Sequence, residues 1–380
     1  MSTEWRPITS GPKYHWFGYY DKWQFDQSGR YVLGMEVDFE HRSPLPEDEI
    51  GIGLIDLADG DRWRELGRTL AWGWQQGSML QWVPGVSNQV VWNDREDGAF
   101  VARVLDLETG GVRTLPRAVY TLSPDGETAV CADFRRIQDM RPGYGYAGVA
   151  DPNAGQLAPE DSGIWRQDMR TGASELIVTV AEVAAMDYPH GDISSAKHYF
   201  NHLLFSPDGQ RFIFLHRWRF GAGGFHTRML TASIDGSDIR VVDDYGKTSH
   251  FIWRDPEHIL AWSWHPSAQE AFYLYGDGDG SAATVGKGVM RVNGHCSYLP
   301  DGEWILNDTY PQGENRLQEL YLYQVASNRR WDLGAWPAPE PYTGEWRCDL
   351  HPRFDREGTQ IVIDSAHRDG RQMYLLEMEA

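Results

Sequence analysis

Seven copies of one pattern, an apolar strand that ends in a tight polar turn, recur along the chain and restrict its fold more than any other feature. The turn FSPDG at 205–209 returns as LSPDG from Leu122 and YLPDG from Tyr298, and looser copies begin at Phe25, Trp82, Trp253 and Phe354. A second and a third apolar strand follow each turn, and most units add another turn and a fourth strand. Four-stranded units at a spacing of roughly 40–60 residues are typical of a β-propeller. We therefore expect an all-β, seven-bladed β-propeller with four-stranded blades.

The seventh unit lacks an outer strand, because the chain ends shortly after its third strand. The segment TEWRPIT, from Thr3 to Thr9, predicts the missing strand, which would close the ring inside the last blade and leave no exposed sheet edge. Residues 1–380 are then expected to form a single propeller domain. A pair of β-sandwiches is the alternative, and the seven repeats disfavour it.

The composition is that of a globular protein and narrows the classes of partner. Hydrophobic residues make up 41% of the chain, which carries 17 Trp and 18 Tyr, so a large core is available. A formal charge of −20 disfavours nucleic acids and anionic membranes as partners. No apolar run has membrane-spanning length, no signal-peptide pattern is visible, and the 3 cysteines form no closely spaced motif. These features predict a cytoplasmic protein without a disulfide framework.

Four histidines occupy one structural position when the seven turns are aligned without gaps. The eight-residue segments that end at the turns begin with Lys22, Ser78, Val119, His202, His250, His295 and His351. In a propeller this position begins the innermost strand of a blade, beside the central channel, so neighbouring blades direct imidazoles to one place. Two interpretations remain open: each histidine hydrogen-bonds within its own blade, or the group forms a metal or acid–base site.

The metal interpretation gains a fourth ligand from Cys348, three residues before His351. A thiolate and an imidazole at this spacing can bind one ion. Together with His250 and His295 they form a mixed nitrogen and sulfur set, which favours zinc among divalent metals. His202 would then be free for proton transfer.

Polar loops gather at the same end of the channel, because the second strand of each blade returns to it. The longest segment, at 133–163, far exceeds an ordinary hairpin connection and predicts a lid or a substrate wall. One hairpin, at 197–219, brings polar side chains to this end from both of its strands: His198, Tyr199, His202, His216, Arg217 and Arg219.

Four motifs resemble those of the oligogalacturonate lyases and, more loosely, the ulvan-type lyases: HYFNHLLFSPDG, TSHFIW, AWGWQQGSMLQW and CDLHPRF. These families are seven-bladed propellers that cleave uronate-containing polysaccharides by β-elimination. The resemblance implies that His202 lies in the active centre and that a manganese-type ion is bound by histidines and the Gln of a Q-x-x-H-x-H motif. In this chain Cys348 stands at the Gln position, His351 at the first His and Arg353 at the second. The thiolate favours zinc over manganese, and Arg353 is expected to face an anionic sugar.

The chemistry of β-elimination assigns roles to these residue types. The uronate carboxylate must be neutralised, for which Arg217, Arg219 and Arg353 are candidates, and a base and an acid are needed, for which His202, His198 and Tyr199 are candidates. Sugar contacts are expected from Gln76, Trp74, Trp218 and Tyr310, although packing between blades explains the aromatic side chains equally well. The predicted function is a metal-containing lyase whose partner is a uronate-containing oligosaccharide or polysaccharide. A non-catalytic propeller that binds a glycan or a protein is the alternative.

Overall fold

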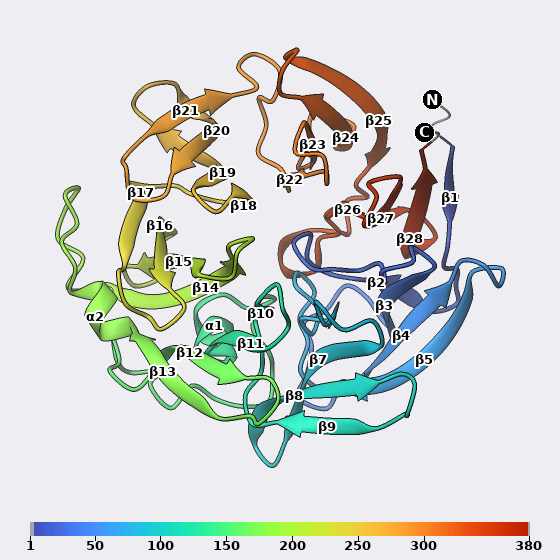
Figure 1. The fold of residues 1–380 in the computed structure, drawn as a ribbon, viewed down its shortest axis with the longest axis horizontal. Coiled ribbons are helices and arrows are strands. Elements are labelled where there is room, and N and C mark those ends of the chain that lie inside the picture. Colours follow the sequence, from blue (N-terminus) through green and yellow to red (C-terminus); the bar gives the residue numbers. More distant parts are fainter. Residues whose placement is uncertain (1–3, 379–380) are drawn as a thin grey trace.

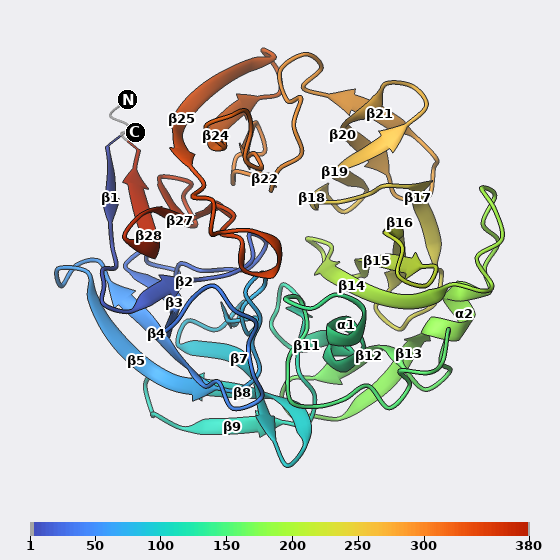
Figure 2. The same cartoon turned by 180° about the vertical axis from the view of Figure 1, so that it is seen from behind.

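The computed structural model describes residues 4–378 as seven antiparallel four-stranded sheets arranged in a ring (Figures 1 and 2). This confirms the predicted seven-bladed β-propeller. The first three blades consist of β2 (Tyr14–Trp16), β3 (Tyr31–Val37), β4 (Ile50–Asp56) and β5 (Arg62–Thr69); β6 (Gln81–Trp82), β7 (Gln89–Glu96), β8 (Ala99–Asp106) and β9 (Val112–Leu115); and β10 (Thr121–Leu122), β11 (Thr128–Ala132), β12 (Gly163–Asp168) and β13 (Ser174–Thr179).

The next three blades follow the same order from the inner to the outer strand. They consist of β14 (Lys197–Phe205), β15 (Arg211–Arg219), β16 (Phe225–Ser233) and β17 (Arg240–Gly246); β18 (Phe251–Asp255), β19 (His258–His265), β20 (Gln269–Gly276) and β21 (Ala282–Val285); and β22 (Ser297–Tyr298), β23 (Trp304–Asp308), β24 (Leu317–Gln324) and β25 (Arg329–Pro337).

The seventh blade contains both ends of the described chain, as predicted. Its strands are β26 (Arg353–Phe354), β27 (Gln360–Arg368), β28 (Gly370–Glu377) and β1 (Trp5–Pro7). β1 pairs antiparallel with β28, with Trp5 opposite Leu376, and the two strands lie side by side in Figure 1. The amide of Ile8 extends this pairing by a hydrogen bond of 2.9 Å to the carbonyl of Met373. Thr3, the first residue of the predicted strand, lies outside the described residues.

The repeated S-P-D-G turn has a clear physical basis in blade 4. The hydroxyl of Ser206 donates to the carboxylate of Asp208 at 2.6 Å, and the amide of Gly209 donates to the carbonyl of Ser206 at 2.9 Å. Gly209 has a φ of 70°, a conformation that a side chain would oppose. The turn reverses the chain between the first and second strands, so the first strands all begin at the opposite end of the channel.

Blade 1 departs from the prediction, because the residues before its turn do not form an inner strand. Phe25 makes only an isolated bridge with Val32, and the segment from Phe17 to Lys22 instead enters the channel. The Tyr20 hydroxyl donates to the carbonyl of Phe251 in blade 5 at 2.7 Å, while the amide of Phe17 donates to Asp364 in blade 7. This segment, residues 17–22, therefore lies inside the ring and links blade 1 to blades 5 and 7.

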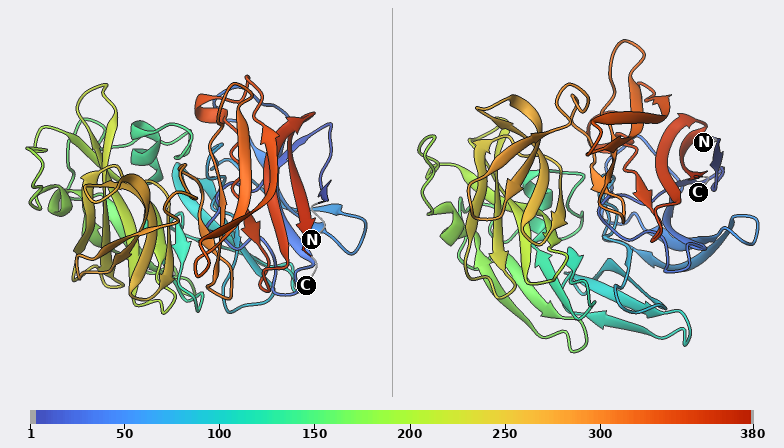
Figure 3. Two further views of the ribbon diagram at one scale, coloured as in Figure 1. Left: turned by 90° about the horizontal axis from the view of Figure 1, so that it is seen from above. Right: turned by 45° about the horizontal axis from the view of Figure 1, so that its top comes forward.

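Helices are few: α1 (Phe134–Met140), α2 (Val180–Ala184) and the 3-10 turn η1 (Gly344–Trp346). α1 lies on one face of the ring in the edge-on view of Figure 3. Asp133 caps it, and the buried Arg136 fixes the following loop by donating to the carbonyls of Asn153, Gln156 and Leu157. Within residues 4–378, no helix has the length and apolar character needed to cross a membrane.

Candidate active site at the histidine end of the channel

A cavity of about 570 Å³ opens at the end of the channel where the inner strands begin. Four blades and the long segment at 133–163 contribute to its lining, which includes Tyr19, Arg141, Tyr144, Arg217, Phe225 and Tyr310. The predicted substrate wall therefore supplies two lining residues, Arg141 and Tyr144, from the loop that follows α1. The cavity is polar and carries more guanidinium than carboxylate groups.

Arg217 is the least satisfied cation of this cavity. Its side chain lies on β15 opposite Tyr199 of β14, and the residue is only 5% exposed. Neither Nε nor Nη1 has a hydrogen-bond partner in the described part of the chain. Burial, together with the nearby charge of Arg141, lowers the pKa of Arg217. A buried guanidinium without a partner is costly, and an anionic ligand in the cavity would relieve that cost.

Two further guanidinium groups meet at the hydroxyl of Tyr144. Arg141 donates to it at 3.0 Å and Arg347, just after η1, donates to it at 2.7 Å. Arg347 also forms an ion pair of 2.7 Å with Asp349. Burial alone would raise the pKa of Tyr144, but the charges of Arg141 and Arg347 outweigh burial and lower it. Tyr144 is therefore a more acidic phenol than usual.

Three side chains near this cavity form a potential metal site: ligand atoms of His295, Asp349 and His351 all lie within 4.8 Å of one another. His295 is held by Asp308, whose two carboxylate oxygens each lie 2.9 Å from Nδ1. Its Nε2 is buried and has no partner in the described chain, and the same is true of Asp349 Oδ1. Unpaired imidazole and carboxylate atoms, with a carboxylate behind the imidazole, fit a divalent metal ion.

His250 lies beside this group, with its ring centroid 4.1 Å from that of His295. Both of its ring nitrogens already have partners, because Nδ1 lies 3.0 Å from Asn293 Oδ1 and Nε2 lies 3.3 Å from the Tyr310 hydroxyl. Of the predicted ligands, His295 and His351 are therefore brought together, and His250 is their neighbour.

Cys348 does not join the group. Its side chain packs with Tyr342 and Ala366, and burial raises the pKa of the thiol to about 12, so it stays protonated. The adjacent Asp349 supplies the ligand atom that the sequence assigned to Cys348. The thiolate argument for zinc has no basis in this geometry, and a set of two imidazoles and a carboxylate suits several divalent metals.

His202 is buried behind Tyr19 in a hydrogen-bonded chain. The Tyr19 hydroxyl lies 3.3 Å from His202 Nδ1, and His202 Nε2 lies 3.1 Å from a carboxylate oxygen of Asp21. Burial lowers the pKa of His202 to about 4. Burial would raise the pKa of Asp21, but Lys22 and the bond to His202 outweigh it and lower the pKa to about 2. Asp21 is thus ionised, so His202 carries its proton on Nε2 and accepts from Tyr19 through Nδ1.

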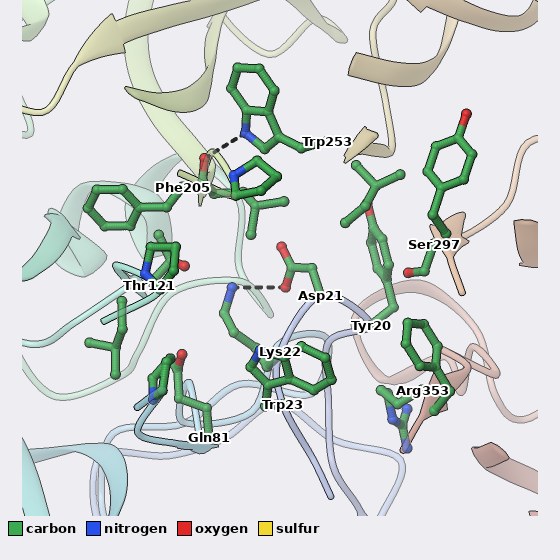
Figure 4. A pocket seen from close by; sticks show the side chains of 18 of the residues that line it. Tyr20, Asp21, Lys22, Trp23, Gln81, Thr121, Phe205, Trp253, Ser297 and Arg353 are labelled. Atoms are coloured by element: carbon green, nitrogen blue, oxygen red, sulfur yellow. Dashed lines mark hydrogen bonds and ion pairs between the residues drawn. The ribbon is translucent and has the colours of Figure 1, made fainter. Parts of the chain in front are cut away.

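The ion pair of Asp21 with Lys22, at 2.8 Å, faces the other end of the channel (Figure 4). A cavity of about 720 Å³ opens there, lined in part by the turn prolines Pro84, Pro124, Pro207 and Pro300. This second cavity is the larger one, but its lining is mostly apolar. Its charged groups are paired except for Arg356, which stacks on Trp23 and leaves a single unpartnered atom, Nε. The unpaired polar atoms described above cluster at the histidine end, so we assign the candidate active site there.

The hairpin of β14 and β15 divides its polar residues between two faces. Tyr199 and Arg217 lie opposite each other on one face, and the Tyr199 hydroxyl also lacks a partner in the described chain. His198 and Trp218 lie on the other face. His198 Nδ1 lies 2.9 Å from His216 Nε2, and Trp218 packs with Ile193 and Ala196. The hairpin therefore brings Arg217 to the cavity and places Tyr199 on the same face, whereas His198 and Trp218 lie on the opposite face.

The remaining predicted contacts are mostly structural. Arg353 is fully buried and paired with Asp364 at 2.8 Å, so its charge is already neutralised. Trp74 is buried against Trp16 and donates to the Arg42 carbonyl. Gln76 accepts from the Tyr120 hydroxyl at 3.0 Å, and Arg219 lies partly exposed at the strand end, near the carbonyl of Asp139. Tyr310, in contrast, lines the cavity.

Sequence reasoning missed Tyr19, Arg141, Tyr144, Arg347, Asp349 and Phe225. The unusual length of 133–163 was a signal for two of them, and Lys22 in place of a histidine was a signal for the blade 1 segment. No pattern distinguished Asp349 or Arg347 from ordinary loop residues.

Comparisons with known proteins found no matching family model and no matching curated protein. Among solved structures, oligogalacturonate lyase from Vibrio parahaemolyticus has a TM-score of 0.68 at 14% identity, covering 98% of this chain and 93% of that chain. An oligogalacturonate lyase in complex with manganese also scores 0.68 at 16% identity, covering 99% and 93%.

A puromycin-hydrolyzing peptidase from Mycobacterium tuberculosis scores 0.55 at 15% identity, covering 95% of this chain and 55% of that chain. At these identities a likeness shows the fold alone. The chain is therefore a seven-bladed propeller that is similar in structure to oligogalacturonate lyases.

Proposed function

We propose that the chain is a lyase that cleaves uronate-containing oligosaccharides or polysaccharides by β-elimination. One observation carries this proposal: the unpartnered, buried guanidinium of Arg217 lies in a cavity that is also lined by tyrosine hydroxyls and adjoins a potential metal site. The structural likeness to oligogalacturonate lyases supports the same class of substrate. The chain as a whole has a net charge of −20, so a cavity with a local excess of cations is a specific indication of an anionic ligand.

The reaction requires a carboxylate that is bound and neutralised before a proton can leave the adjacent carbon. In β-elimination the C5 proton passes to a base, the C4–O bond breaks with its electrons going to the leaving oxygen, and a C4=C5 double bond forms as that oxygen is protonated. Negative charge develops on the carboxylate during proton removal. Arg217 is suited to this charge because no protein group competes for Nε and Nη1 in the described chain.

His295, Asp349 and His351 are the residues that would hold a divalent ion. When bound, such an ion supplies Lewis-acid stabilisation of the carboxylate. A structurally similar oligogalacturonate lyase is known in complex with manganese, which supports a divalent metal in this proposal. The donor atoms of this chain support a divalent ion without selecting zinc or manganese.

Tyr19 is the base in this proposal, with His202 behind it. Tyr19 faces the cavity, whereas His202 Nδ1 lies 3.3 Å from its hydroxyl. As the Tyr19 oxygen takes the C5 proton, its own proton passes to His202 Nδ1, and the ionised Asp21 stabilises the resulting imidazolium. Tyr144, whose pKa is lowered by Arg141 and Arg347, is the acid that protonates the leaving oxygen.

The direct test is incubation of the purified protein with a panel of uronate polysaccharides while the ultraviolet absorbance of the unsaturated product is followed. We expect product from at least one of them, loss of turnover after chelation, and its return on adding a divalent metal. Tyr19→Phe should lower turnover about 10²–10⁴-fold, the range for removing a general base. If wild-type protein binds a uronate glycan but forms no unsaturated product, the chain is a non-catalytic, glycan-binding propeller and not a lyase.

A further inference from the structure

Two exposed phenyl rings stand on the loop beside the candidate active site. Phe220 follows β15 and is 43% exposed, and Phe225 begins β16 and is 45% exposed. No other Phe, Tyr or Trp among residues 4–378 is classed as exposed, although the chain is rich in aromatic residues. Exposed aromatic side chains need no explanation when scattered singly, but two on one loop tip beside a polar cavity indicate a contact surface.

Phe225 differs from Phe220 in what it touches. It lines the cavity, and Phe220 does not. The guanidinium carbons of Arg217 and Arg141 lie 4.6 Å and 4.7 Å from the centre of the Phe225 ring. The ring thus lies next to the unpartnered guanidinium to which we assign the substrate carboxylate, while almost half of its residue surface remains open to solvent.

The loop that carries these rings contains no side chain that would cover them. Residues 221–224 are GAGG, and a Cβ added at Gly221 or Gly224 would meet no atom within 4 Å. The backbone is nevertheless closed by a hydrogen bond of 3.0 Å from the Gly223 amide to the Phe220 carbonyl. Phe225 is also held in register by β16, opposite Arg219. The backbone of Phe225 is therefore fixed, and the part of its ring that Arg141 and Arg217 do not cover is open to solvent.

We infer that Phe225 is a sugar-binding platform on which the ring of the uronate residue stacks while Arg217 receives its carboxylate. This inference rests on the proposed function and narrows its substrate class. The apolar C–H face of a pyranose ring matches an aromatic face, and a carboxylate on the ring edge would reach the neighbouring guanidinium groups. An acyclic carboxylate can pair with Arg217 but cannot stack on the Phe225 ring, so the site selects cyclic uronates.

The experiment compares three variants, Phe225→Ala, Phe225→Trp and Phe220→Ala. Phe220→Ala is the matched control, because it removes an equally exposed ring from the same loop outside the cavity. With a uronate oligosaccharide that wild type turns over, Phe225→Ala should raise KM about tenfold and change kcat less than about twofold, since stacking acts on binding. Phe225→Trp should keep KM within about twofold of wild type, and Phe220→Ala should change neither constant.

A binding measurement separates this inference from the proposed function. Ligand-observed NMR with galacturonate, glucuronate and the acyclic glucarate should show weaker binding of the two cyclic acids to Phe225→Ala, and no change for glucarate. Wild-type protein that binds cyclic uronates through Phe225 without forming product would overturn the lyase and keep the platform. Turnover with an unchanged KM in Phe225→Ala, or a fall in kcat alone, would overturn the platform and keep the lyase. Absence of any uronate binding to wild type would overturn both.

Discussion

The two faces of the β14–β15 hairpin carry similar residue types but opposite degrees of hydrogen bonding. On one face, Arg217 and Tyr199 are buried with unpartnered polar atoms. On the other face, both imidazoles use all of their ring nitrogens: Arg228 Nε donates to His216 Nδ1, His216 Nε2 donates to His198 Nδ1, and His198 Nε2 donates to the Ile193 carbonyl. Both imidazoles are neutral in this chain.

The difference shows which buried polar groups are available to a ligand. A satisfied network stabilises the blade and has no capacity left for another partner. An unsatisfied buried cation costs folding free energy, so its presence indicates a partner that arrives later. Arg217 of β15 and His198 of β14 lie on two strands that pair directly with each other. Arg217 nevertheless belongs to the candidate site, whereas His198 stabilises the fold.

The largest effect is expected from removing the unpartnered cation. Arg217→Ala should lower turnover about 10²–10³-fold, the scale for losing one preorganised electrostatic group. Thermal unfolding should be unchanged or shifted upward, because the variant removes a buried charge without a partner. Arg219→Ala, two residues along the same strand and partly exposed, is the control and should keep most of the turnover. Equal losses in both variants would show that the buried, unpartnered position of Arg217 is not what matters, because Arg219 lies on the same face at the open strand end.

A second comparison uses two adjacent residues with opposite environments, Cys348 and Asp349. Asp349→Ala should weaken binding of the divalent ion about 10²-fold, since it removes a ligand atom that no protein group occupies. Cys348→Ala should leave the metal content near one ion per chain, because the thiol is buried among Tyr342 and Ala366. Elemental analysis after gel filtration measures both. Metal lost from the Cys348 variant alone would restore the sequence-based ligand set.

The sequence predicted the ring, its closure and the gathering of histidines, because repeats and turn chemistry are local patterns. It could not predict which face each side chain occupies. Alternation along β14 would put His202 on the face of His198, but a bulge between Asn201 and Leu204 and a φ of 51° at His202 shift it to the channel beside Tyr19. Such a bulge depends on contacts from other blades.

Blade 1 illustrates the same limit. Its turn matched the repeat, yet the preceding residues fill the channel rather than forming an inner strand. Tyr20 exchanges hydrogen bonds with the backbone of Phe251 across the ring, at 2.7 Å and 3.0 Å. These bonds exist only after the ring has closed, so the sequence of one blade contains no sign of them.

The satisfied face should respond in stability rather than in turnover. His198→Ala should lower the free energy of unfolding by about 2–3 kcal/mol, because it leaves His216 Nε2 buried without an acceptor and opens a cavity. Turnover per folded molecule should stay near that of wild type. Urea unfolding and active-fraction kinetics measure the two effects. A large loss of turnover in a stable His198 variant would assign this face to the site after all.

The smallest effect is a pH dependence that belongs to the satisfied face. Burial lowers the pKa of His198 to about 4, and burial, together with Arg228 and His198, lowers that of His216 further. Below about pH 6.5, His198 and His216 bind protons in the unfolded chain but remain neutral in the folded chain. The free energy of unfolding therefore falls as pH drops from about 6.5 toward 4. Each histidine that is protonated only in the unfolded chain lowers the free energy of unfolding by at most about 1.4 kcal/mol per pH unit. His198→Gln should therefore lose stability less steeply than wild type over this range, by up to that slope, in urea titrations at stepped pH. Equal slopes would show that His198 is protonated in the folded state. The hydrogen bonds exclude this, because His198 Nδ1 accepts from His216, which in turn accepts from Arg228.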